Sequence, residues 1–134
     1  EVIIFLSKMS KIIYLNFLLF IFIFLKIAWS EGFLECIDDI PISLEFTENY
    51  EECLNFNSDS GVISMVEANT LIDPKEIIKY YTKILPSFGW KIKELSKDKS
   101  YMIFNRDKDV LEISIFLMEN NFYKISYNFL SLVK

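Results

Sequence analysis

Four stretches in the C-terminal half of the chain alternate between apolar and polar residues. They cover residues 90–95, 101–106, 110–118 and 122–130, and short polar segments typical of turns separate them. Successive side chains of a β-strand point to opposite faces of a sheet, so a period of two indicates a strand with one buried face. The pattern therefore predicts four strands joined by hairpin turns, which makes neighbouring strands antiparallel.

A helical period precedes these strands, between Asp73 and Gly89. Asp73 is a good N-cap, and Pro74 suits the first helical position, where its missing N–H costs nothing. Gly89 is suited to the left-handed conformation that ends many helices. The apolar residues between these signals have the spacing of one helix face: Ile77, Ile78, Tyr81, Ile84 and Leu85. The sequence thus predicts an amphipathic helix that begins at Pro74 and leads into the strand at Trp90.

Residues 61–71 are rich in apolar and β-branched side chains, which predicts one further strand before the helix. A strand, a helix and four more strands in this order predict an α+β domain over residues 61–134. Its antiparallel sheet of about five strands carries the amphipathic helix on one face. Residues 31–60 show no sustained period and are interrupted by Pro41, so we expect an extended acidic arm there.

The N-terminal segment has the features of an export signal. Residues 12–25 form an apolar run that follows two lysines, and Ala28-Trp29-Ser30 offers the small residues of a cleavage site. We expect residues 1–30 to be a signal peptide that directs the domain to the periplasm. Residues 1–8 would then lie upstream of a true start at Met9. The alternative is an uncleaved anchor that keeps the apolar run in the inner membrane.

Charge is distributed unevenly along the chain. Residues 31–73 contain eleven acidic residues and no Lys or Arg, whereas residues 74–134 contain eleven basic and seven acidic residues. The acidic segment is either a solvated face or a surface for a cation or a basic partner. Nucleic-acid binding is not expected, because thirteen lysines and one arginine offer little of the planar, bidentate geometry that binds phosphate.

The chain contains two cysteines, Cys36 and Cys53, and both follow the predicted signal peptide. In an oxidising compartment they could form a disulfide, and a loop of this length would stabilise the fold by roughly 3 kcal/mol. The alternative is a pair of free thiols. A zinc site is not expected, because two cysteines and no histidine leave too few preferred ligands.

A catalytic site is also not expected from this sequence. The chain has no histidine, which removes the commonest general base near neutral pH. The segment that holds both cysteines is acidic, and neighbouring carboxylates raise the pKa of a thiol rather than activate it. The carboxylate pairs lie in segments with turn chemistry and are interpreted as surface acids: Asp38/Asp39, Glu51/Glu52 and Asp107/Asp109. We therefore expect a protein without enzymatic activity, cofactor or metal.

Six short motifs follow one another along the chain: Asp38-Asp39-Ile40-Pro41, Gly61-Val62-Ile63, Tyr80-Tyr81, Leu85-Pro86, Gly89-Trp90 and Arg106. In this order, and over most of residues 38–116, they resemble a family of small exported alphaproteobacterial proteins of unknown function. The chain differs at Val62, where the family often carries arginine, and in its cysteine pair, which the family pattern lacks. The resemblance implies export and an α+β domain, and it implies no reaction.

Four residues are the candidate contacts with a ligand or partner: Tyr80, Asp38, Asp39 and Arg106. Tyr80 lies off the main apolar face of the predicted helix, and the other three belong to the motifs above. The leading hypothesis is a periplasmic or envelope binding protein that contacts an envelope protein through the acidic arm or an exposed sheet edge. The alternatives are a carrier of a small apolar ligand between helix and sheet, and a membrane-anchored complex subunit.

Overall fold

The computed structural model describes residues 1–24 and 32–133, and the chain divides into two compact units, residues 1–30 and 31–134. The first unit contains the 23-residue helix α1 (Val2–Phe24), of which the part Val2–Phe20 is long and apolar enough to cross a membrane. At about 1.5 Å per residue the helix is roughly 35 Å long, against about 30 Å for a hydrocarbon core. A signal peptide and a membrane anchor both have these properties. The expected cleavage site at Ala28-Trp29-Ser30 lies outside the described residues.

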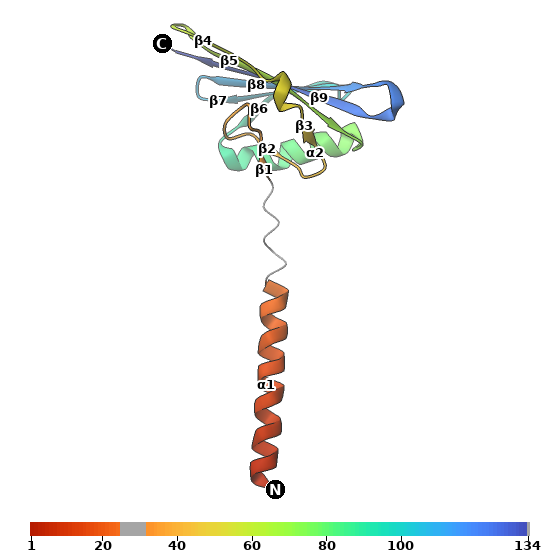
Figure 1. Cartoon of the computed structure of the whole chain (residues 1–134). Helices are drawn as coiled ribbons and strands as arrows, with labels where there is room; N and C mark the ends of the chain where they lie inside the picture. The colour runs from red at the N-terminus through yellow and green to blue at the C-terminus, as the bar shows by residue number, and fades with distance from the viewer. Residues whose placement is uncertain (25–31, 134) are drawn as a thin grey trace. The chain divides into compact units, whose positions relative to one another are not determined.

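The second unit is an antiparallel sheet with one α-helix on one of its faces (Figure 1). The strands follow the spatial order β3-β5-β9-β8-β7-β6, and β4 pairs with the same edge of β5 as β3 does. A separate two-stranded sheet joins β1 (Gly32–Phe33) to β2 (Pro41–Ile42). The strands of the large sheet are β3 (Thr47–Glu48), β4 (Leu54–Ser58), β5 (Gly61–Thr70), β6 (Lys91–Leu95), β7 (Tyr101–Arg106), β8 (Asp109–Leu117) and β9 (Tyr123–Leu132).

The predicted helix and the predicted hairpins are confirmed. α2 (Pro74–Ile84) begins after Asp73, whose carboxylate accepts a hydrogen bond of 2.9 Å from the backbone N–H of Lys75. A short 3₁₀ helix, η3 (Leu85–Phe88), extends it to Gly89, which adopts the left-handed conformation with φ of 83°. Strands β6 to β9 then pair in sequence as antiparallel neighbours.

The prediction of about five strands was wrong, because the sheet has seven. The two additional strands, β3 and β4, come from the segment 31–60 that we expected to be an arm. β3 is only two residues long, and it pairs with Asn69 and Ala68 at the far end of β5. β4 lies at the surface with all five residues exposed, and its alternation is short because the strand contains only two apolar residues, Leu54 and Phe56. Both strands form by pairing with the edge of β5 that β9 leaves open. This pairing joins segments that a local sequence pattern does not connect.

One hydrophobic core lies between the sheet and the layer formed by α2 and residues 32–46 (Figure 1). The sheet contributes alternate residues of β5, β7, β8 and β9, and α2 contributes the predicted apolar face. The largest fully buried side chains are Trp90, Tyr81, Tyr127, Phe104, Ile40, Ile77, Leu85, Met102, Leu111, Ile113, Ile125 and Val66.

The segment 32–53 is held onto this core by three kinds of interaction. Six of its side chains are buried in the core: Leu34, Cys36, Ile37, Ile40, Ile42 and Phe46. The Glu48 carboxylate accepts hydrogen bonds from the backbone N–H groups of Glu35, at 2.9 Å, and Cys36, at 3.0 Å. Cys36 and Cys53 form a disulfide with a Cα–Cα distance of 5.6 Å. The acidic segment is therefore part of the folded domain.

A pair of buried hydroxyl groups joins α2 to the centre of the sheet. Tyr81 Oη and Tyr127 Oη lie 2.6 Å apart, and burial raises the pKa of Tyr127. Tyr81→Phe should lower the free energy of unfolding by about 1–3 kcal/mol, because the Tyr127 hydroxyl then stays buried without this partner. A double-mutant cycle with Tyr127→Phe, measured by urea unfolding, should give a coupling of at least about 0.5 kcal/mol. Strict additivity of the two substitutions would contradict this assignment.

Candidate functional site

The two edges of the large sheet have opposite character. β6 carries Lys91, Lys93 and Glu94, and its register with β7 shifts between Ile92 and Glu94. Charged side chains and bulges hinder pairing with a further strand. β4 has the sequence Leu-Asn-Phe-Asn-Ser, without charge, proline or register shift, and all five residues are exposed. At β4 the sheet is therefore open to an additional strand (Figure 1).

An apolar patch lies beside this edge, on the sheet face opposite α2. In the register of the sheet, Phe56 pairs with Ile63, Ile63 with Leu130, and Leu130 with Val110, so these side chains form one row across four strands. Leu54 and Met65 form a second pair next to the row. Around Ile63 and Leu130 the surface has a shallow, mostly apolar depression of about 260 Å³. We call this the apolar patch: Leu54, Phe56, Ile63, Met65, Val110 and Leu130.

The apolar patch ends where the same sheet face becomes polar. Lys124 Nζ and the Glu67 carboxylate form an ion pair of 2.9 Å. The hydrogen bond to Glu67 raises the pKa of Lys124, so the lysine stays charged in the folded domain. This ion pair therefore bounds the apolar patch at the end of β5 and β9 that lies away from the β4–β5 turn.

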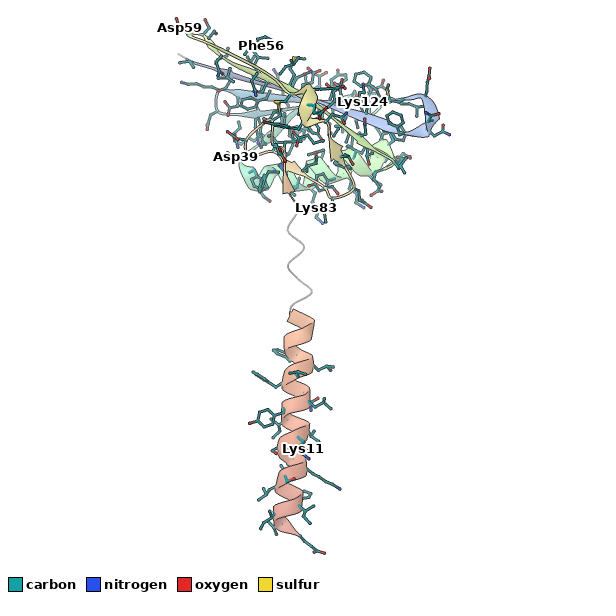
Figure 2. All side chains as sticks on the ribbon, viewed as in Figure 1. Lys11, Asp39, Phe56, Asp59, Lys83 and Lys124 are labelled. Atoms are coloured by element: carbon teal, nitrogen blue, oxygen red, sulfur yellow. A yellow bond between two sulfur atoms is a disulfide. The ribbon has the colours of Figure 1, made fainter. Side chains whose placement is uncertain are left out.

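On the opposite face of the sheet, beside β4, lies a polar hollow of about 530 Å³. Its floor is formed by Asn55 and Asn57 of β4 and by residues of β5 and β9, and its rim by the loop that follows β1. We call it the acidic hollow and define it by the polar side chains that line it: Glu35, Asp38, Asp39, Asn55, Asn57, Ser64, Arg106 and Ser131. Figure 2 shows Asp39 on the helix side of the sheet, and Phe56 and Asp59 on the β4–β5 hairpin.

Three of the four predicted contact residues meet in the acidic hollow. Asp38 and Asp39 are exposed, and no hydrogen bond or ion pair joins their carboxylates to another described residue. Arg106 is already engaged. Its guanidinium stacks on the Trp90 ring at 4.4 Å, donates to the Phe88 carbonyl at 3.2 Å and pairs with Asp109 at 3.4 Å. The hollow therefore keeps uncompensated negative charge.

Tyr80 lies elsewhere. Its ring packs edge-on against Phe46 and Tyr81, with ring centroids 5.5 and 4.8 Å apart. It lines a separate depression of about 240 Å³ between α2 and residues 43–46, beside Lys79 and Lys83. The structure thus does not bring Tyr80 to the acidic hollow.

Sequence reasoning missed the residues that link the apolar patch to the acidic hollow. Phe56 points to the patch, whereas its neighbours Asn55 and Asn57 line the hollow. The alternation Leu-Asn-Phe-Asn was a visible signal for such a strand, but the segment contains only two apolar residues. Ser64 had no signal, because its 5% exposure follows from the non-local pairing of β5 with β4 and β9.

The site offers three kinds of surface to another molecule. Both cysteines are joined in the disulfide, so neither is available as a thiolate nucleophile. Among the described residues no three metal-ligating side chains lie close enough together to hold an ion. The site offers backbone hydrogen-bonding groups along an edge, apolar surface on one side and carboxylates on the other.

Comparison with protein-family models, with curated proteins and with solved structures finds no match for this chain. The resemblance to small exported proteins, which rests on short motifs, therefore stays a prediction.

Proposed function

We propose that this chain is a non-enzymatic binding protein of the cell envelope, and that it captures an extended segment of another envelope protein as an additional strand on β4. The observation that supports this proposal is the contrast between the two sheet edges. β6 is charged and irregular, whereas β4 is regular and uncharged, and all five of its residues are exposed. Natural sheets usually protect their edges, so an unprotected edge beside an apolar patch is typical of a binding surface.

Export of the domain is part of this proposal. The Cys36–Cys53 disulfide suits an oxidising compartment such as the periplasm. The apolar helix α1 suits either a signal peptide or an anchor in the inner membrane. If α1 stays attached, the binding domain works as the tethered subunit of a membrane complex. If it is removed, the same domain works in the periplasm.

The alternative of a carrier for a small apolar ligand has less support. Such a ligand would need space between α2 and the sheet. That space is occupied by Tyr81, Trp90 and Phe104, which are at most 1% exposed. We therefore favour binding at the outer edge of the sheet.

Site-specific photo-cross-linking tests the proposal. A benzophenone amino acid replaces Phe56 of β4, which is 59% exposed, or Ile92 of β6, which is 50% exposed, in the full-length protein in its native envelope. We expect the probe at Phe56 to cross-link one envelope protein, with the attachment point in a single extended segment. The probe at Ile92 is the matched control, because it is an apolar position of similar exposure on the protected edge.

Equal labelling from both positions would contradict strand addition at β4. Labelling from neither position would contradict a stable partner at either edge. A cross-link between two copies of this chain would show that β4 forms a homodimer and does not capture another envelope protein.

A further inference from the structure

We infer that the segment captured by β4 alternates between apolar and basic side chains. This inference rests on the proposed function and names the chemistry of the partner. It follows from the different surfaces that lie on the two faces of the sheet next to β4. An added strand continues the alternation of its neighbour, so its successive side chains reach the two faces in turn.

The register of the β4–β5 pair defines these two faces. Leu54 and Phe56 lie opposite Met65 and Ile63, which belong to the apolar patch. Asn55 and Asn57, in contrast, line the acidic hollow. Every second side chain of an added strand therefore lies beside the apolar patch, and the side chains between them point toward the acidic hollow.

The apolar patch requires apolar partners. Phe56 and Leu54 are 59% and 50% exposed, and Ile63 and Met65 are 44% and 38% exposed. When no further strand pairs with β4, these side chains form a continuous apolar surface that is exposed to solvent. Cross-strand contacts between large apolar side chains stabilise neighbouring strands, so Val, Ile, Leu or aromatic residues fit this side.

The acidic hollow requires basic partners. The carboxylates of Glu35, Asp38 and Asp39 line it, and the one guanidinium among its lining residues, that of Arg106, is occupied by Asp109 and the Phe88 carbonyl. Ser64 also lines the hollow and is 5% exposed, and its hydroxyl has no hydrogen-bond partner among the described residues. A lysine ammonium offers three donors on a flexible stem, which suits several acceptors in a roomy, polar site.

The ends of β4 also favour a basic segment over a second copy of this chain. Glu51 and Glu52 precede β4, and Asp59 follows it in the turn to β5. In an antiparallel pair of two β4 strands, Asp59 of one copy would face the Glu51-Glu52 end of the other. Like charges opposite each other destabilise a strand pair, whereas lysines at the ends of a partner segment would meet carboxylates.

Synthetic peptides test this inference on the full-length protein in detergent micelles. The probe is a heptapeptide in which Lys and Val alternate, beginning and ending with Lys. The first control peptide has the same composition with all lysines before all valines, and the second has Glu in place of Lys. We expect the alternating Lys–Val peptide to bind, and a benzophenone at Phe56 to cross-link it. We expect the blocked peptide and the Glu peptide to bind much more weakly.

The triple variant Glu35→Gln/Asp38→Asn/Asp39→Asn should raise the Kd of the alternating peptide about tenfold, because each exposed ion pair contributes modestly and three are removed. A matched variant, Glu76→Gln/Glu94→Gln/Glu119→Gln, removes the same charge from exposed positions on α2, β6 and the turn after β8. It should change Kd by less than about twofold, because these positions lie away from β4.

Three outcomes would overturn the inference. They are equal binding of the blocked peptide, equal binding of the Glu peptide, and an equal effect of the two triple variants. In each case a cross-link from Phe56 to an envelope protein would still support capture at β4, so only the partner chemistry would fail. If the probe at Phe56 cross-linked no envelope protein, both the proposed function and this inference would be contradicted. A cross-link to a second copy of this chain would show self-association at β4 in place of binding to a basic segment.

Discussion

Trp90→Ala is expected to lower the free energy of unfolding by about 3–5 kcal/mol, the cost of removing a large aromatic side chain from a packed core. Trp90 is 1% exposed and is the largest of the fully buried side chains. Its ring packs edge-on against Phe129, with centroids 6.3 Å apart, and carries the Arg106 guanidinium at 4.4 Å. The substitution therefore leaves a cavity between the end of η3 and the sheet, and it removes the surface on which Arg106 lies.

Urea unfolding of the full-length protein in micelles, followed by far-ultraviolet circular dichroism, measures this effect. Ile92→Ala is the control, since Ile92 is half exposed on β6 and its truncation should change the free energy of unfolding by no more than about 0.5 kcal/mol. Trp90→Phe should cost clearly less than Trp90→Ala. It keeps most of the volume and removes Nε1–H, which has no hydrogen-bond partner among the described residues. A Trp90→Ala protein as stable as the Ile92→Ala protein would contradict the core position of the indole.

Removal of the disulfide is expected to lower the free energy of unfolding by about 3 kcal/mol, since a bond across 17 positions restricts the unfolded chain to this extent. The bond joins Cys36, beside the rim of the acidic hollow, to Cys53, the residue before β4. Reduction should therefore also weaken binding at β4, because the edge and the hollow lose their covalent link.

Unfolding of the oxidised protein, the reduced protein and the Cys36→Ala/Cys53→Ala variant gives this difference directly. The intact mass of the oxidised protein should be lower by two hydrogens, and reductant should leave the stability of the double variant unchanged. A reductant that fails to shift the unfolding midpoint of the oxidised wild-type protein would contradict a stabilising role for the bond. If only peptide binding changed, the bond would serve to position the site rather than to stabilise the fold.

The candidate site was only partly predictable. Asp38, Asp39 and Arg106 were candidates from their motifs, and the structure places them around one hollow. Nothing in the sequence indicated that Arg106 would be held by Trp90 and the Phe88 carbonyl, because these contacts join segments that are distant along the chain. Its third partner, Asp109, is only three positions away, across the turn between β7 and β8. Tyr80 was also a candidate contact, because it lies off the main apolar face of the predicted helix. The packing of α2 against Phe46 places it in a different depression.

By itself the sequence determined the elements whose signals are local. The cap at Asp73, the left-handed Gly89 and the period of α2 depend on neighbouring residues, and so do the hairpins from β6 to β9. Only the tertiary structure decided that β9 pairs with β5, and that β3 and β4 occupy the other edge of β5. These pairings join distant segments, and their stability comes from burial and cross-strand contacts that a local pattern does not contain. The binding edge, its apolar patch and its acidic hollow all follow from these non-local pairings.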